Sequence, residues 1–323
     1  MDPTRGRRRA RGSGRTATIA LIVLASLIAA ACGPGPANDR PAPAAGGTEG
    51  AFPVTIDSAA GSVELVAAPE RIVSLSPSST EMLFAIEAGD QVVAVDDQSD
   101  FPSDAPITDL SGYEPNVEAI ASYEPDLVVM DVAPPALKRS FKKLAIPLLQ
   151  QPAPRDITGT YAQIEELGAA TGHTDEAAGL VSEMQADIDE LVVSIPTFDE
   201  APTYYHELDD TYFSVTSETF IGEVYSMMGL ENIADEAKGA GSGYPQLSGE
   251  YIIEADPDLI FLADTDCCDQ SAETVAERAG WNQIAAVRNG HVVELSDDVA
   301  SRWGPRVVEF LRNVADAVNE LDG

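Results

Sequence analysis

At residues 116–130 the chain reads Asn116-Val117-Glu118-Ala119-Ile120-Ala121-Ser122-Tyr123-Glu124-Pro125-Asp126-Leu127-Val128-Val129-Met130, and at residues 248–262 it reads Ser248-Gly249-Glu250-Tyr251-Ile252-Ile253-Glu254-Ala255-Asp256-Pro257-Asp258-Leu259-Ile260-Phe261-Leu262. In both copies a glutamate stands seven residues before a proline, and Pro-Asp-Leu leads into an apolar run. A Gly-Tyr pair precedes each copy, as Gly112-Tyr113 and as Gly243-Tyr244. Recurrence of this kind indicates two similar structural units within one chain.

Each copy predicts a short helix followed by a buried strand. The helix must end before the proline, because the residue before a proline is sterically pushed out of the helical region. The four or five residues that follow are apolar, which is typical of a strand covered on both faces of a parallel sheet. The sequence therefore predicts two α/β lobes, each with a glutamate, Glu118 or Glu250, at the same place on its rim.

The residues before the first repeat indicate that the sheets are parallel and doubly wound. A buried strand at 72–75 is followed by Ser78-x-x-Glu81, which has the form of a capping box and predicts a helix as far as Ile86. A second strand is expected at 91–95. This strand–helix–strand order is typical of parallel α/β sheets.

A long helical pattern lies between the two repeats. Apolar residues recur at helical spacing over 175–193, and after Gly179 no glycine or proline interrupts the pattern before Pro196. A single long helix would be a stiff connection between the lobes. The expected organisation is an N-terminal lobe over 51–173, a linking helix over 174–196 and a C-terminal lobe over 197–323.

The amino terminus has the features of an export signal. Six arginines precede an apolar run from Ile19 to Ala31, which is too short for a comfortable membrane span. The run ends in Ala31-Cys32, which resembles the cleavage site of a lipoprotein, and 32–50 is rich in proline, alanine and glycine, as a flexible tether would be. We therefore expect a signal peptide over 1–31 and a lipid on Cys32, which would hold the chain on the extracytoplasmic face of the cell membrane. The alternative is an ordinary secretory signal that is cut near Ala31.

The charge balance excludes nucleic acid as a partner. The chain has 19 basic and 54 acidic residues. The predicted signal contains six of the basic residues and one of the acidic residues, so the remaining chain has a formal charge of −40. Binding to phosphate backbones needs clustered lysine and arginine, and anionic lipid would repel such a surface as well. Membrane contact is therefore expected through the lipid on Cys32 alone. Most of the carboxylates are interpreted as solvated surface groups, and the sequence does not decide whether they reflect a saline habitat.

Neither enzyme nor metal-site motifs stand out. No Gly-x-Ser-x-Gly elbow and no Gly-x-Gly-x-x-Gly loop occurs near the first strand. The three histidines, His173, His206 and His291, are scattered, and a metal site needs several convergent ligands. Cys267 and Cys268 are adjacent, so they either form a vicinal disulfide or remain as two thiols in a loop. We expect no enzymatic activity, no cofactor and no protein metal site.

Six short motifs, taken in order, resemble one known family. They are Arg71-Ile72-Val73-Ser74-Leu75-Ser76-Pro77-x-x-Thr80-Glu81, Ser99-Asp100-Phe101-Pro102, Asn116-Val117-Glu118 with Pro125-Asp126-Leu127, Gly229-x-Glu231-Asn232-Ile233, Pro245-Gln246-x-Ser248-x-Glu250 and Ser301-Arg302-x-Gly304-Pro305-Arg306. Together they are similar to the substrate-binding proteins of ABC importers for cobalamin, ferric siderophores and haem. The resemblance spans about Glu70 to Leu321.

The resemblance implies two Rossmann-like lobes joined by one helix, with the ligand held between them and little lobe closure. It also implies a monomer whose Glu118 and Glu250 dock onto arginines of a permease dimer, which carries its own ATPase. The expected ligand is a metal chelate, either cobalamin or a ferric siderophore. The alternative is a receptor for haem or for a bare transition metal ion. A hydrolase is a weaker alternative.

The cleft should be lined by loops that follow the strands, as in other doubly wound sheets. Flat aromatic side chains there suit a corrin, a porphyrin or catecholate rings, and an arginine suits an anionic or amide group. Each tyrosine could instead be a half-buried residue of the rim. The candidate ligand contacts are Gln98, Tyr113, Glu207, Tyr212, Tyr244, Asp297, Arg302 and Trp303; of these, Tyr113, Tyr244 and Arg302 fall where the resemblance implies ligand contacts.

Overall fold

The computed structural model describes residues 52–58 and 61–321. The predicted signal peptide, the tether over 32–50 and the lipidated Cys32 lie outside these residues. None of the described helices has the length and the apolar character that crossing a bilayer requires.

The first lobe, the N-lobe, contains a four-stranded parallel sheet. Its strands are β3 (Ile72–Leu75), β4 (Val92–Val95), β5 (Leu127–Met130) and β6 (Leu148–Gln150), in the spatial order β4-β3-β5-β6. An antiparallel hairpin of β1 (Val54–Ser58) and β2 (Gly61–Leu65) packs beside α4 and β6. The helices of this lobe are α1 (Pro77–Ala85), α2 (Val117–Ala121), α3 (Pro135–Leu144) and α4 (Ile157–Thr171), with a short 3-10 helix at Gly89–Gln91.

The second lobe, the C-lobe, repeats this topology. Its parallel strands are β7 (Thr203–Glu207), β8 (Glu231–Asn232), β9 (Leu259–Leu262) and β10 (Val292–Glu294), in the order β10-β9-β7-β8. Read in chain order, both sheets place the second strand beside the first, then the third and the fourth on the other side. Its helices are α6 (Phe220–Met227), α7 (Gly249–Ala255), α8 (Thr265–Cys268), α9 (Ala272–Glu277), α10 (Ala285–Asn289) and α11 (Asp297–Ser301), with 3-10 turns at Ala240–Ser242 and Trp281–Gln283.

Each sheet is buried on both faces. In the N-lobe, Val73 and Val128 face α2 and α3, while Ile72 and Val129 face α1 and α4. The central strands β5 and β9 have no exposed residue, as a sheet covered by helices on both sides requires. The prediction of two α/β lobes with parallel sheets is confirmed.

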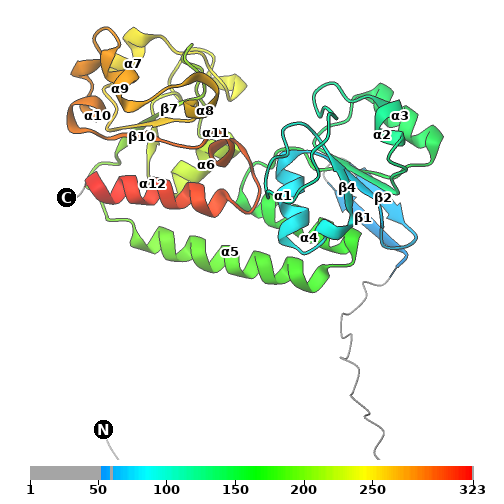
Figure 1. The fold of residues 1–323 in the computed structure, drawn as a ribbon. Coiled ribbons are helices and arrows are strands. Elements are labelled where there is room, and N and C mark those ends of the chain that lie inside the picture. The colour runs from blue at the N-terminus through cyan, green and yellow to red at the C-terminus, as the bar shows by residue number, and fades with distance from the viewer. Residues whose placement is uncertain (1–51, 59–60, 322–323) are drawn as a thin grey trace, which may run out of the picture. The chain divides into compact units, whose positions relative to one another are not determined.

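One core extends through both lobes. Buried residues of α1 and α4 in the N-lobe, of α5 (Thr174–Ser194), and of α6 and α12 (Val307–Leu321) form a single hydrophobic cluster. Helices α5 and α12 lie side by side along the molecule (Figure 1). The long helix lies within the predicted linking range, 174–196. The residue limits of the lobes themselves stay predictions.

The repeated Pro-Asp-Leu has the same structural role in both lobes. The carboxylate of Asp126 accepts hydrogen bonds from the backbone N–H groups of Glu70 and Arg71, at 2.8 and 2.9 Å. Asp258 accepts from the N–H and the hydroxyl of Thr203, at 2.9 and 3.0 Å. Each aspartate therefore holds the start of the first strand of its lobe against the third strand.

The expected capping box at Ser78-x-x-Glu81 is wrong. The helix begins one residue earlier, with Ser76 as the N-cap, and the Ser76 hydroxyl accepts from the N–H of Ser79. Pro77 occupies the first helical position, where its missing N–H costs nothing. Glu81 is therefore free of any capping role, and its side chain is directed into the protein instead.

We predict that replacing the repeated aspartates lowers the free energy of unfolding unequally. Asp126→Ala should cost about 0.5–1.5 kcal/mol, because the freed N–H groups lie at the surface and can bind water. Asp258→Ala should cost about 1–3 kcal/mol, because Asp258 and Thr203 are half-buried. Urea unfolding would measure both. Glu114→Ala, which changes an exposed carboxylate with no hydrogen bond or ion pair in the described part of the chain, is the control. Equal losses in all three variants would contradict the assignment.

Candidate ligand-binding cleft

Polar residues follow all four strands of the N-lobe sheet. Ser76, Asp96, Asp131 and Gln151 come directly after β3, β4, β5 and β6. Because the strands are parallel, these residues meet at one edge of the sheet, where ligands of doubly wound folds bind. Gly112 lies against this edge, and a Cβ there would stand 2.6 Å from a carboxylate oxygen of Asp96, so only glycine allows this approach.

A cavity of about 480 Å³ opens at this edge. Its N-lobe wall comes from the ends of β3, β4 and β5 and the loops after them, and its other wall comes from α11 and the residues that follow it. The lining residues are Leu75, Ser76, Pro77, Ser78, Asp96, Gln98, Gly112, Tyr113, Met130, Asp131, Val132, Asp298, Ser301, Arg302 and Trp303. The size is within the usual range for small-molecule sites.

The chain crosses back to the N-lobe directly after α11. The guanidinium of Arg302 donates to Glu81 Oε1 at 3.0 Å and to the carbonyl oxygen of Gln98 at 2.9 Å. It also pairs with Asp100 at 3.0 Å and with Asp298 at 2.5 Å. The Trp303 indole N–H donates to the Gln163 side chain at 3.0 Å. Arg302 and Trp303 thus form the cavity wall and join the lobes at the same time.

Glu81 is the centre of this junction. Its side chain is 2% exposed and binds Arg306, at 2.6 Å, in addition to Arg302. Gly304 lies between the two arginines in the sequence, and a Cβ there would stand 3.0 Å from the Glu81 carboxylate. The Arg-x-Gly-Pro-Arg motif therefore places two cations around one buried carboxylate.

The floor of the cavity is acidic. Asp96 is 4% exposed, and burial raises the pKa of its carboxyl above the usual range. Burial, with a smaller effect from the Asp96 charge, raises the pKa of Asp131 to about 6. One oxygen of Asp131 is buried without a hydrogen-bond partner. Arg302, whose charge is already balanced by carboxylates, is the cation among the described lining residues, so the floor offers acceptors rather than positive charge.

Four of the eight predicted ligand contacts line this cavity. Gln98 and Tyr113 do so from the N-lobe, and Arg302 and Trp303 from the segment after α11. Tyr113 is 94% exposed at the opening. Most of the N–H donors of Arg302 are occupied within the protein. Its main contribution to the cavity is therefore to form part of the wall.

The other four lie elsewhere. Glu207 is fully buried and paired with Arg278 at 2.5 Å, so it presents no surface to a ligand. Tyr212 packs beside Trp281 and lines a separate cavity of about 510 Å³ in the C-lobe. Tyr244 is half exposed and is not among the lining residues, and Asp297 accepts backbone hydrogen bonds from α8.

Several lining residues escaped the sequence reasoning, namely Ser76, Asp96, Asp131, Val132 and Asp298. The signal that could have found the first three is their position as the first polar residue after a buried parallel strand. Asp298 gives no such signal, because its place in the cavity wall depends on its ion pair with Arg302, which the sequence pattern does not show.

The family model of the periplasmic binding proteins matches residues 72–299 of the chain. The chain belongs to this family. As a family member it is a solute-binding protein that works with an ABC transporter, and not an enzyme. The resemblance noted in the sequence is thereby confirmed.

Curated relatives match nearly the whole chain. An uncharacterised ABC transporter substrate-binding lipoprotein of Bacillus subtilis, YvrC, is 31% identical over 93% of this chain and 95% of its own length. A cobalamin-binding protein of Halobacterium salinarum is 31% identical over 94% of this chain and 84% of its own length. The crystal structure of the periplasmic vitamin B12-binding protein BtuF of Vibrio cholerae superposes with a TM-score of 0.64 at 22% identity, covering 79% of this chain and 98% of that one, which shows the shared fold.

The two repeated glutamates of this periplasmic binding protein are exposed at equivalent places. Glu118 stands in the first turn of α2 and Glu250 in the first turn of α7, after the N-cap residues Asn116 and Ser248. Neither carboxylate has a hydrogen bond or an ion pair within the described chain. Glu250 also lines the separate C-lobe cavity.

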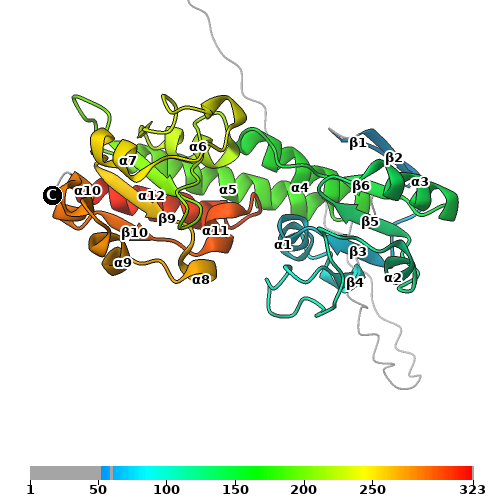
Figure 2. The ribbon, with the colours of Figure 1, turned by 90° about the horizontal axis from the view of Figure 1, so that it is seen from above.

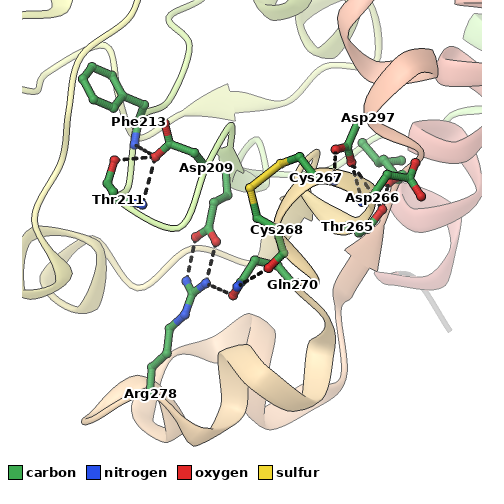
Figure 3. Close-up of a disulfide and its surroundings, with 12 residues drawn as sticks. Asp209, Thr211, Phe213, Thr265, Asp266, Cys267, Cys268, Gln270, Arg278 and Asp297 are labelled. Atoms are coloured by element: carbon green, nitrogen blue, oxygen red, sulfur yellow. Dashed lines mark hydrogen bonds and ion pairs between the residues drawn. A yellow bond between two sulfur atoms is a disulfide. The ribbon is translucent and has the colours of Figure 1, made fainter.

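Cys267 and Cys268 are joined in a vicinal disulfide, which was one of the two expected states. They are the last two residues of α8, and Figure 3 shows the bond between their sulfur atoms. Among the described residues, no group of three or more His, Cys, Asp or Glu side chains could hold a metal ion.

We predict that Glu81→Gln lowers the free energy of unfolding by about 3–5 kcal/mol, because it leaves two largely buried guanidinium groups without their shared carboxylate. Urea unfolding of the mature chain would measure the loss. The matched control is Glu218→Gln, which removes the partner of Arg155 in an interlobe pair with both side chains more than 80% exposed. That change should stay within about 0.5 kcal/mol of wild type. Similar effects of the two substitutions would contradict a central role for Glu81.

Proposed function

We propose that the chain is an extracytoplasmic lipoprotein that captures cobalamin in the interlobe cavity and delivers it to an ABC permease. A ferric siderophore is the other chelate that the fold could accept. The observation that supports cobalamin is the charge of the cavity, whose floor carries Asp96 and Asp131 and whose arginine is already paired.

Hydrogen-bond acceptors on the floor select a ligand with donors. The periphery of a corrin carries neutral carboxamides, whose N–H groups can donate to carboxylates, and such charge-assisted bonds are about twice as strong as neutral ones. A catecholate siderophore brings negative charge to the same place, and like charges at short range cost several kcal/mol. The Asp131 oxygen that has no hydrogen-bond partner is therefore available to accept a hydrogen bond from a ligand.

The cavity also offers flat and apolar contact area. Tyr113 is 94% exposed and Val132 is 63% exposed, both at the lining of the cavity. A monomeric protein keeps such side chains in solvent at no benefit to its own stability, whereas the face of a macrocycle would cover them. The cavity is smaller than a corrinoid, so the ligand would be enclosed on one side and extend toward the C-lobe.

Haem is a second candidate because of one side chain. The Tyr113 phenol stands at the opening, and tyrosine can serve as an axial ligand of haem iron. The propionates of haem would, however, meet the acidic floor. Nothing among the described residues favours a bare metal ion.

The relatives support the same assignment. One curated relative is itself a substrate-binding lipoprotein and another is itself a cobalamin-binding protein. The location follows from the export signal and from Cys32, whose lipid would be the single membrane attachment. We infer that the chain needs no cofactor and acts as a monomer.

We predict that cyanocobalamin binds and that its affinity falls as the pH drops through about 6, the pKa of Asp131. The ionised carboxylate accepts the ligand donors, and protonation removes this acceptor charge. Asp131→Asn should weaken binding by about 3- to 10-fold near pH 7.5, the difference between a charged and a neutral hydrogen bond, and should flatten the pH profile. Tryptophan fluorescence would follow the titration.

The control is Asp109→Asn, which removes one negative charge from an exposed position between β4 and α2 that does not line the cavity. A ferric tris-catecholate and haem complete the panel, and Asp131→Asn should bind the catecholate no more weakly than wild type does. Preference for the catecholate or haem over cyanocobalamin in the wild type would overturn the ligand assignment.

We propose further that Glu118 and Glu250 set the register of the permease. Two exposed and unpaired carboxylates at equivalent places of two similar lobes suit a two-fold symmetric partner with one basic pocket per subunit. The large net negative charge supplies long-range attraction, so the two glutamates matter for local pairing rather than for encounter.

We predict that the double change Glu118→Ala with Glu250→Ala abolishes uptake, while cyanocobalamin affinity and the melting temperature remain close to wild type. Each single change should give an intermediate loss, because a basic pocket left without its carboxylate costs several kcal/mol. A transport assay in cells and a titration of the purified protein would measure the two properties. The pair Glu114→Ala with Glu273→Ala is the control for lost surface charge. Normal uptake by the double variant would exclude the docking role.

A further inference from the structure

The Cys267–Cys268 disulfide joins the last two residues of the single turn of α8, which follows β9, the third strand of the C-lobe. Cys267 is exposed and Cys268 is half-buried. An isolated helix of four residues has no stability of its own, because nucleation costs more than one turn of hydrogen bonds returns. The position of α8 therefore depends on contacts outside the turn, and the disulfide restricts the backbone of the two residues that it joins.

The main outside contact is Asp297, the first residue of α11. Its carboxylate accepts from the backbone N–H groups of Asp266 and Cys267, at 3.0 and 2.8 Å, and from the Thr265 hydroxyl at 3.4 Å (Figure 3). Helices α8 and α11 lie side by side (Figure 2). One carboxylate thus links the turn that carries the disulfide to the helix that forms the cavity wall.

Helix α11 connects Asp297 to residues that line the cavity. Asp298, the neighbour of Asp297, lines the cavity and pairs with Arg302 at 2.5 Å. Ser301, Arg302 and Trp303 follow in the same wall. A shift of α8 that withdraws the two N–H groups from Asp297 would therefore release the first turn of α11 and the side chains that follow it.

A second contact leads into the C-lobe interior. The side chain of Gln270 donates to the Cys268 carbonyl at 3.0 Å and accepts from Arg278 at 2.6 Å (Figure 3). Arg278 in turn binds the buried Glu207. Asp264, at the start of α8, is buried, and burial and the nearby Glu207 carboxylate raise its pKa to about 7. The two hydrogen bonds of Gln270 tie the end of α8 to Arg278.

We propose that the Cys267–Cys268 disulfide is a redox-sensitive positioning element of the ligand site, which holds α8 and, through Asp297, the α11 wall of the cavity. Reduction to two thiols frees the backbone of the turn, loosens this wall and weakens the hold on the ligand. The inference rests on the proposed function for its ligand, but the motion of α8 and α11 can be measured without any ligand.

The reductant is a small dithiol. One of its thiolates attacks the exposed Sγ of Cys267, a new sulfur–sulfur bond forms, and the Cys267–Cys268 bond breaks, so that the Cys268 sulfur leaves and takes up a proton. The second thiol of the reductant then attacks the mixed disulfide and releases Cys267 as a thiol. Two electrons pass from the dithiol, which becomes a cyclic disulfide, to the cystine.

The first experiment follows amide hydrogen exchange of the mature protein before and after dithiothreitol, with the reductant removed under anaerobic conditions. We expect faster exchange in 264–270 and in 297–303 after reduction, and unchanged exchange in β3, β5 and α4. Reoxidation should restore the original protection. Unchanged exchange in 297–303 would overturn the proposal, because the coupling to the cavity wall would be absent.

The second experiment measures cyanocobalamin affinity in the oxidised, reduced and reoxidised protein. Reduction should weaken binding by about 5-fold or more, within the usual range of coupling between sites, and reoxidation should reverse it. The double variant Cys267→Ser with Cys268→Ser should bind like the reduced protein and should not respond to dithiothreitol, with the same circular dichroism as wild type. Equal affinity of the oxidised and reduced wild type would also overturn the proposal.

A third arm tests the route through Asp297. Asp297→Asn in the oxidised protein should raise exchange in 297–303 with the disulfide intact, and Glu273→Gln, an exposed acid of α9, should not. If oxidised wild type binds no cyanocobalamin, the proposed function fails, and the exchange data still decide on the positioning role. A rise in exchange confined to 264–270 would limit the disulfide to local packing and contradict the proposal.

Discussion

The structure depends on one buried carboxylate, Glu81, and the two arginines that surround it. Taking a carboxylate out of water is expensive, and the cost is offset only when opposite charges and good hydrogen-bond geometry replace the lost hydration. Arg302 and Arg306 meet this condition from the segment after α11, although Glu81 lies in α1 of the other lobe. The relative position of the lobes is therefore set by an ionic junction as well as by α5. This second connection ties the two walls of the cleft to each other.

The same junction sets the charge of the cavity. Arg302 would be the obvious anchor for an anionic ligand, but its charge is shared among Glu81, Asp100 and Asp298. The floor is left with Asp96 and Asp131, which are acceptors with raised pKa values. A family that binds several metal chelates can in this way separate neutral ligands rich in donors from anionic ones without changing its fold. Under the proposed function, the balance of charge around this one arginine is the selective element.

The two lobes share a topology but use their strand ends differently. In the N-lobe the residues after β4 and β5 face an open cavity. In the C-lobe the carboxylates at the ends of β7 and β9, Glu207 and Asp264, are buried, and Arg278 neutralises Glu207. After β9 the chain enters α8, which contains the disulfide. In the N-lobe the residues after the corresponding strand, β5, line the cavity instead. One lobe thus supplies the floor of the cavity, and α11 with the residues after it supplies the opposite wall.

The sequence by itself determined the elements, the parallel sheets and the two-fold repeat, because apolar periodicity, proline positions and the Pro-Asp-Leu motif act over a few residues. It also indicated Gln98, Tyr113, Arg302 and Trp303 as cleft residues from their place after strands and in the family motifs. It misread Glu81 as part of a capping box, since Ser78-x-x-Glu81 satisfies the local pattern and the true partners are more than two hundred residues away. It placed Glu207 in the cleft because the end of a parallel strand is a usual site, whereas Arg278 buries this carboxylate. Which charged groups pair, and which remain free for a ligand, was decided by the tertiary structure, because electrostatic pairing depends on distances in space that no local pattern encodes.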